Sequence, residues 1–183
     1  DLGSTEAQKT GEWRDGIGRL LAGPALPPQA AALLAPYLTV VRSLNAGDGI
    51  VRYPGSPLLA RRLMRAEDHL VANELHPDDV VALRWLLASE PNSKVLALDG
   101  YVALRALLPP KERRGLVLID PPFEATGELE RLAAAVADAM RRFATGTLLI
   151  WYPIKDAAAT AAFHRSITGL GLARLLVVEL LLR

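Results

Sequence analysis

Three acidic residues, Glu74, Asp99 and Asp120, each stand at the end of a short apolar segment of the sequence. If these segments are parallel strands of one sheet, the acids lie at the edge where open α/β sheets bind ligands. Glu74 then suits the hydroxyl groups of a ribose, and Asp99 with Gly100 suits the amino group of an adenine. Any one of these acids is more simply explained as a cap of the following loop or helix. Three of them in successive units favour a ligand that contains a nucleoside.

The third acid opens the sequence Asp120-Pro121-Pro122-Phe123. It resembles the Asp/Asn/Ser-Pro-Pro-aromatic motif of methyltransferases that modify adenine N6, cytosine N4 or the glutamine amide. An exocyclic amine is a poor nucleophile because its lone pair is delocalised into the ring. The Asp120 side chain and the Pro121 carbonyl can accept hydrogen bonds from both N–H groups of the amine and so favour a pyramidal nitrogen. The prolines fix φ and remove competing N–H donors, and Phe123 offers a face for a flipped base. The alternative is a simple strand-to-loop break, which double prolines often mark.

The elements that must position these residues follow from the hydropathy pattern. From residue 54 on, short apolar segments alternate with segments of helical periodicity, which predicts βαβ units and a doubly wound parallel sheet with helices on both faces. The continuous apolar runs are typical of strands that are covered on both faces. Ser56 is the expected N-cap of the first helix, with Pro57 as its first residue, and Pro77 starts the second helix. The predicted strands are residues 69–74, 94–98, 115–119, 147–152 and 174–182, and the predicted helices are residues 57–68, 77–90, 101–107, 128–143 and 156–168.

The N-terminal region has a different pattern, in which no strand is expected. Apolar residues at helical spacing predict a helix at residues 12–21, and a second helix at residues 30–44 follows a proline-rich break. We therefore expect a helical insertion or subdomain at residues 1–53 and an α/β core at residues 54–183.

The composition fits a globular domain and excludes several kinds of site. The chain has 183 residues, of which 51% are hydrophobic and 22% are charged, and its formal net charge is +1. That charge gives no general attraction to nucleic acid, so any basic surface must be local. The sequence has no cysteine, which rules out disulfides and thiolate metal sites. Its histidines, His69, His76 and His164, lack ligand spacing, so we expect no metal. No apolar run is long enough to cross a membrane.

Longer segments of the chain carry a more specific likeness. They are GSTEAQKTGEW (3–13), RYPGSPLLARRL (52–63), NELHPDD (73–79), LDGYVAL (98–104), RRGLVLIDPPFE (113–124) and RRFATGTLLIWYPI (141–154). Together they closely resemble the RlmJ family, the S-adenosylmethionine-dependent 23S rRNA adenine-N6 methyltransferases of bacteria. The resemblance implies a Rossmann-like class I methyltransferase fold in a monomeric, cytoplasmic enzyme. It also implies that the substrate is 23S rRNA, either naked or in an early assembly intermediate.

The resemblance further implies roles for individual residues. The catalytic residues would be Asp120, Pro121, Pro122 and Phe123, which would hold the flipped target base. The residues that bind S-adenosylmethionine would be Ser56, Glu74, Asp99, Gly100 and Asp120. A helix N-terminus at Ser56 suits an anionic group such as the methionine carboxylate of the cofactor. Ser56 can also be explained as an ordinary N-cap, and the two roles are compatible.

The chain also departs from the family pattern. Members of the RlmJ family carry an N-terminal helix, a first strand and a Gly-rich cofactor loop that have no counterpart in this sequence, and the last strands are cut short. We therefore expect the chain to be a fragment of a larger enzyme. Two alternatives to rRNA methylation stay open. The first is N-methylation of DNA adenine or protein glutamine, and the second is a non-catalytic relative that binds nucleic acid.

Basic residues occur in clusters around Arg61, Lys111 and Arg141. The Arg61 cluster lies on a predicted helix and is at least as well explained as a solvated face. The Lys111 cluster precedes the strand that ends at Asp120, so it is expected at the opposite edge of the sheet. Tyr152 and Lys155, near the edge that carries Asp120, are better candidates for RNA contacts, with Lys155 meeting a phosphate. Packing is an equally good explanation for Tyr152.

Overall fold

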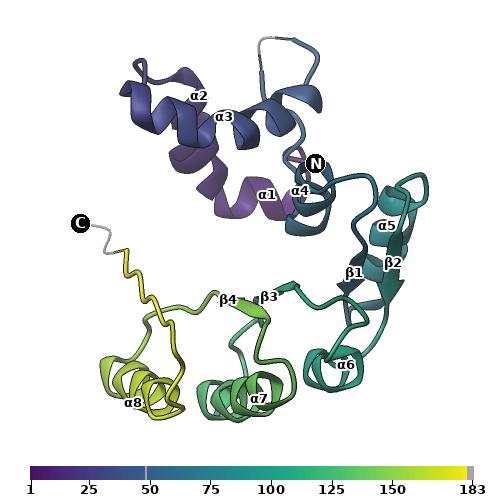
Figure 1. The fold of residues 1–183 in the computed structure, drawn as a ribbon. Coiled ribbons are helices and arrows are strands. Elements are labelled where there is room, and N and C mark those ends of the chain that lie inside the picture. Colours follow the sequence, from purple (N-terminus) through teal and green to yellow (C-terminus); the bar gives the residue numbers. More distant parts are fainter. Residues whose placement is uncertain (48, 181–183) are drawn as a thin grey trace. The chain divides into compact units, whose positions relative to one another are not determined.

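The computed structural model describes residues 1–47 and 49–180 of the chain, which divides into two compact units, Asp1–Ala97 and Leu98–Arg183 (Figure 1). Each unit contains a pair of parallel strands together with helices, which confirms the predicted α/β class. The predicted domain boundary after residue 53 falls inside the first unit and stays a prediction. It coincides with the change from helices alone to alternating helices and strands. Within the described ranges, no helix has the length and apolar character needed to cross a membrane.

The first unit begins with a series of helices, some of which enclose a small apolar core. They are α1 (Thr5–Thr10), η1 (Arg14–Gly18, a π-helical turn), α2 (Arg19–Ala22), α3 (Pro28–Ser43) and α4 (Ser56–Leu63). Ile17, Leu38 and Val41 form the buried centre. The predicted helix at residues 12–21 is confirmed as η1 and α2, but its backbone is kinked at Gly16, where ψ is −107°. α3 confirms the second predicted helix, whereas α1 was not predicted.

The predicted N-cap at Ser56 is wrong by one residue. Gly55 is the cap of α4, with an extended backbone (φ −69°, ψ 163°), and its carbonyl accepts the first helical hydrogen bond from the Leu59 amide at 3.0 Å. Ser56 is therefore the first helical residue. Pro57 has no N–H, so the amides of Gly55, Ser56 and Leu58 are the donors without an intrahelical partner at this helix start.

The strand pair of the first unit consists of β1 (Leu70–Asn73) and β2 (Ser93–Leu96), and α5 (Pro77–Leu87) connects them. The strands are parallel, with Leu70 opposite Ser93. The predicted helix start at Pro77 is confirmed. Asp78 and Asp79 lie in the first turn of α5, where carboxylates interact favourably with the helix dipole.

The second unit packs its helices on one face of its strand pair (Figure 1). Its elements are α6 (Gly100–Leu107), β3 (Leu116–Ile119), α7 (Glu128–Arg142), β4 (Thr147–Ile150) and α8 (Ala157–Thr168). β3 and β4 are parallel, with Leu116 opposite Thr147 and Ile119 opposite Ile150. The buried centre consists of Leu132, Val136, Phe163 and Ile167. Ile119 and Ile150 pack against this centre, so the covered face of the strands points toward α7 and α8.

The other face of β3 and β4 carries exposed apolar side chains. Leu116, Leu118 and Leu149 are 67%, 46% and 55% exposed. Burial alternates along both strands, which is the pattern of strands with one covered face, whereas their apolar sequence predicted cover on both faces. The predicted strand at residues 174–182 is not formed over residues 174–180. Residues 181–182 lie outside the described residues.

Candidate active site

Asp120 begins the turn that follows β3 in the second unit. Hydrogen bonding between the two strands continues to the border of this turn, because the Trp151 amide donates to the Ile119 carbonyl at 3.0 Å. Asp120 itself is exposed, so a ligand can reach it without displacing a core side chain. The strand pair therefore fixes the backbone before Asp120 and leaves its carboxylate open.

Phe123 closes this turn in a conformation that residues other than glycine rarely adopt. Its φ is +52°, in the left-handed region where the β-carbon crowds the backbone at a cost of about 1 kcal/mol or more. The ring is partly buried and packs against the cluster that includes Leu132 and Phe163. Core packing therefore holds the side chain of the strained residue. A role for the Phe123 ring in stacking on a base stays a prediction.

The segment that follows β4 contacts the turn. Lys155 donates from Nζ to the Phe123 carbonyl oxygen at 3.2 Å. The Tyr152 hydroxyl shares a hydrogen bond of 2.5 Å with His164 Nε2, and the Tyr152 ring meets Phe163 edge-on with 5.1 Å between the ring centroids. Tyr152 is thus held by packing contacts, the second of the two explanations that its sequence position allowed. Lys155 is in contact with the Asp-Pro-Pro-Phe turn, which its sequence position did not predict.

Asp99 caps α6 and is held by three donors. Its Oδ1 accepts hydrogen bonds from the amides of Tyr101 at 2.9 Å and Val102 at 3.1 Å, and its Oδ2 accepts one from Arg131 Nη2 at 2.9 Å. The Arg131 guanidinium also lies 4.0 Å from the centroid of the Tyr101 ring, a cation–π arrangement. The Tyr101 hydroxyl in turn donates to Glu128. Two residues of α7 therefore fix the start of α6.

The same donors hold the pKa of Asp99 below its ordinary value. The Val102 amide has the largest effect, burial opposes it, and the Arg131 guanidinium and the Tyr101 amide add to the lowering. The carboxylate is consequently ionised at neutral pH and acts as an acceptor. Beside it, a β-carbon added at Gly100 would meet nothing within 4 Å, so the neighbouring backbone is open to a ligand.

Replacing Arg131 with methionine should raise the pKa of Asp99 toward its ordinary value, because a hydrogen bond and a positive charge are lost. A lowered pKa in the folded state stabilises the protein above the unfolded value, and this stabilisation is lost as the pH falls through the folded value. The pair is about half exposed, so we expect the free energy of unfolding at neutral pH to fall by less than about 1 kcal/mol. This difference should vanish as the pH falls below about 4. An NMR titration of the Asp99 carboxyl carbon measures the shift.

The matched control is Arg141→Met on the same helix, which breaks the separate ion pair with Asp138. This control should leave the titration of Asp99 unchanged. An Asp99 pKa that is the same in Arg131→Met and in the wild type would contradict the assignment.

Glu74 follows β1 in the first unit, with one carboxylate oxygen anchored. Oε1 accepts hydrogen bonds from the amides of Leu75 at 2.7 Å and His76 at 2.9 Å. Its own amide donates to the Leu96 carbonyl at 3.1 Å, so the pairing of β1 and β2 fixes its backbone. Among the described residues, Oε2 has no hydrogen-bond partner. A carboxylate that is held through one oxygen and open at the other suits a pair of hydroxyl groups.

The predicted site residues fall in both units. Ser56 and Glu74 belong to the first unit, whereas Asp99, Gly100 and the turn at residues 120–123 belong to the second. Within the second unit, Tyr101 at the start of α6 and Phe123 of the turn pack against the same buried cluster. The residues expected to bind adenine and those expected to be catalytic are thus supported by one core.

Comparison with known proteins identifies the family. The family model described as "Ribosomal RNA large subunit methyltransferase D, RlmJ" matches residues 1–183. The chain belongs to the RlmJ family. This confirms the resemblance that the sequence segments indicated.

Individual relatives support the same assignment to the RlmJ family. The chain is 40% identical over 183 residues to "Ribosomal RNA large subunit methyltransferase J" of Haemophilus influenzae, covering 100% of this chain and 64% of that protein. It is 37% identical over 179 residues to the protein of the same name from Escherichia coli, covering 98% and 62%. A Legionella pneumophila protein of known crystal structure is 33% identical to this chain in sequence. The two structures match with a TM-score of 0.83, covering 93% of this chain and 61% of that one. The chain therefore spans somewhat less than two thirds of the length of these relatives.

Two arginines of the basic clusters have structural roles in this RlmJ-family chain. Arg61 is only 5% exposed, so the interpretation of its cluster as a solvated face is wrong for this residue. Arg142 donates to the carbonyls of Arg105 and Leu108, both at 2.7 Å, and pairs with Asp138 at 3.0 Å. Because Arg61 is buried and Arg142 would lose these contacts, neither side chain is available to bind RNA.

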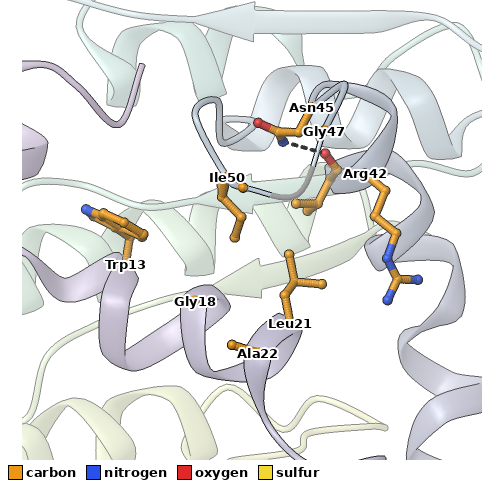
Figure 2. A pocket seen from close by; sticks show the side chains of 10 residues that line it. Trp13, Gly18, Leu21, Ala22, Arg42, Asn45, Gly47 and Ile50 are labelled. Carbon is orange, nitrogen blue, oxygen red and sulfur yellow. Dashed lines mark hydrogen bonds between the residues drawn. The ribbon is translucent and has the colours of Figure 1, made fainter.

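An open cavity of about 670 Å³ lies among the N-terminal helices (Figure 2). Trp13, Leu21, Arg42 and Ile50 are among the residues that line it, and the Trp13 Nε1 atom is buried without a hydrogen-bond partner. None of the predicted site residues of the RlmJ motifs lines this cavity. Across residues 1–47 and 49–180, no group of three His, Cys, Asp or Glu side chains could hold a metal ion.

Proposed function

We propose that the protein methylates N6 of an adenine in 23S rRNA and that S-adenosylmethionine is its methyl donor. The observation that carries the proposal is the turn at residues 120–123, which presents the exposed Asp120 at the carboxyl end of β3 in a chain that belongs to the RlmJ family. The relatives from Haemophilus influenzae and Escherichia coli are ribosomal RNA large subunit methyltransferases by name. The proposed substrate is 23S rRNA that is naked or in an early assembly intermediate, and the proposed active form is a cytoplasmic monomer.

In this proposal the turn prepares the target amine. The Asp120 carboxylate accepts a hydrogen bond from one N–H group of the amine, and the Pro121 carbonyl accepts a hydrogen bond from the other. The nitrogen lone pair is then free to face the methyl donor. S-adenosylmethionine supplies the electrophilic methyl group, and the amine loses one proton, for which Asp120 is the acceptor. The prolines and the left-handed Phe123 fix the two acceptors before the base arrives, which lowers the cost of reorganisation during the reaction.

We further propose that Ser56, Glu74, Asp99 and Gly100 hold the donor. Glu74 fits the ribose because its open Oε2 can accept hydroxyl groups while Oε1 stays anchored. Asp99 fits the adenine amino group as an ionised acceptor, and Gly100 leaves space beside it. The free amides at the start of α4 and the Ser56 hydroxyl fit the methionine carboxylate.

Replacing Glu74 with glutamine should weaken the binding of S-adenosylmethionine by about 10- to 100-fold, because hydrogen bonds to a charged acceptor contribute about 1.5–3 kcal/mol. Calorimetric titration of the complete protein measures the dissociation constant. Glu67→Gln is the matched control, since Glu67 is an exposed acid of the same unit. Equal affinity of Glu74→Gln and the wild type would contradict the ribose assignment.

The function itself is tested with the complete protein and S-adenosylmethionine labelled in the methyl group. The label should enter deproteinised 23S rRNA and be recovered as N6-methyladenine, with less transfer to assembled large subunits. Label in DNA or protein but not in rRNA would favour one of the alternative methyltransferases. Absence of transfer to all substrates, with nucleic-acid binding retained, would favour the non-catalytic relative.

A further inference from the structure

We propose that Lys155 is a positioning residue for methyl transfer, which holds the Phe123 carbonyl and thereby keeps Asp120 and the Pro121 carbonyl aimed at the target amine. The inference rests on the proposed function, because it assumes that the turn at residues 120–123 holds the reacting base. Its structural basis is the hydrogen bond of 3.2 Å between Lys155 Nζ and the Phe123 carbonyl oxygen.

The first step of the argument is that the turn needs support. A bulky residue at φ +52° persists only when the surrounding structure over-determines it. Core packing restrains the Phe123 ring, but a ring can pivot about its side-chain bonds without fixing the backbone that carries it. A donor at the carbonyl acts on the peptide plane itself. Lys155 supplies that donor from outside the turn.

The second step is that Lys155 projects from a segment that is anchored on both sides. Before it, the Trp151 amide donates to the Ile119 carbonyl, and the Tyr152 hydroxyl is hydrogen-bonded to His164 of α8. After it, the Asp156 carboxylate caps α8 by accepting hydrogen bonds from the amides of Ala158 at 2.7 Å and Ala159 at 3.2 Å. The segment between β4 and α8 therefore links the edge of the strand pair to α8, and Lys155 extends that link to the motif.

The third step concerns the size of the effect. Lys155 is exposed, so the loss of its single hydrogen bond should leave the thermal stability almost unchanged. A displacement of about 1 Å in a reacting group, however, can cost about 100-fold in rate. Loss of Lys155 should therefore be visible in turnover rather than in thermal stability.

A direct contact between Lys155 and an RNA phosphate is the competing role. The ammonium group has three donors, of which the Phe123 carbonyl occupies one, so a phosphate contact is chemically feasible. The two roles differ in what they change. Loss of a positioning residue lowers kcat at saturating RNA. Loss of a phosphate contact raises KM for RNA and lowers the salt dependence of RNA binding by about one counterion.

The test compares Lys155→Ala, Lys155→Arg and Lys155→Met with the wild type in the complete protein, using 23S rRNA and labelled S-adenosylmethionine. For the alanine and methionine variants we expect kcat to fall by about 10- to 100-fold, with KM for RNA changed less than about threefold and the salt dependence of binding unchanged. Arginine, which can also donate to the carbonyl, should restore most of kcat. Lys111→Ala is the matched control, an exposed lysine of the same unit in the loop before β3, and should behave like the wild type.

Two kinetic outcomes would overturn the inference. The first is a wild-type kcat in Lys155→Ala. The second is a loss confined to KM together with a weaker salt dependence, which would assign Lys155 to phosphate binding. Amide hydrogen exchange at Phe123 and Glu124 gives a readout that does not depend on the substrate, and exchange should be faster in Lys155→Ala. If the wild type transfers no methyl group to rRNA, the proposed function fails, while unchanged exchange in the variant defeats the positioning role separately.

Discussion

Replacing Asp120 with alanine should reduce methyl transfer to 23S rRNA by about 10²- to 10⁴-fold, the range typical of a lost general base. The exposed Asp120 lies at the border of the β3–β4 pairing, where the Trp151 amide meets the Ile119 carbonyl. Removing its carboxylate therefore leaves the strands and the buried cluster intact. The binding of S-adenosylmethionine should change only modestly, because we propose that Glu74 and Asp99 hold its ribose and adenine. Single-turnover assays and calorimetric titration separate the two quantities.

Asparagine at position 120 refines this prediction. Its side-chain oxygen can still accept an N–H group, but it carries no charge and cannot take a proton as readily. We expect Asp120→Asn to retain more activity than Asp120→Ala if holding the amine dominates, and to match it if proton acceptance dominates. Glu124→Ala, which removes another exposed acid shortly after the motif, is the control and should be close to the wild type. Normal turnover in Asp120→Ala would refute the catalytic assignment.

The element boundaries could be predicted because the chain marks them with local signals. Pro77 starts α5, Asp156 caps α8 and Asp99 caps α6, and each of these effects acts within one helical turn. The N-cap of α4 was misplaced because Ser56 is a strong capping residue by type, whereas the extended backbone belongs to Gly55. The strand at residues 174–182 was predicted from apolar composition alone, which specifies no pairing partner.

The contacts that tune the candidate site could not be predicted in the same way. Asp99 and Arg131 are separated by 32 positions, as are Phe123 and Lys155, and no spacing rule connects residues on different elements. The left-handed backbone of Phe123 is also invisible in the sequence, since bulky residues normally avoid that region. What the sequence does contain is Glu74 and Asp99, two of the three acids at strand ends, whose role as ligands or caps the pattern alone left open.

The structure shows that capping does not exclude a ligand role for these acids. Glu74 uses Oε1 for two backbone amides and keeps Oε2 open among the described residues. Asp99 uses Oδ1 for two amides of α6, and its Oδ2 meets Arg131. Each cap thus fixes the direction of the other oxygen. A carboxylate that is oriented by its own backbone loses less conformational entropy when it binds a ligand, so the structural role supports the proposed function.

Replacing Arg61 with alanine should lower the free energy of unfolding by about 3 kcal/mol, because buried carbonyl groups that lose their donor keep the cost of desolvation. Arg61 Nη1 donates to the Asp68 carbonyl at 2.7 Å and to the Pro91 carbonyl at 3.4 Å, and its Nη2 donates to the Arg65 carbonyl. One guanidinium therefore joins the end of α4 to the turn before β1 and to the loop that leads into β2. Lysine at this position should not rescue stability, since a single ammonium group cannot reproduce the planar fork.

Arg62 provides the matched comparison, because it is the next residue on the same helix and carries the same charge. Its side chain is 51% exposed and pairs with Glu90 at 2.8 Å, so Arg62→Ala should cost less than about 1 kcal/mol. Urea unfolding of both variants measures the contrast, and the salt dependence of RNA binding should be the same in Arg61→Ala as in the wild type. Equal stability of the two variants would contradict the structural role of Arg61. A weaker salt dependence in Arg61→Ala alone would indicate that Arg61 contacts RNA. The expected contrast shows that a cluster of like charges in a sequence need not act as one surface, because burial separates residues that the sequence places side by side.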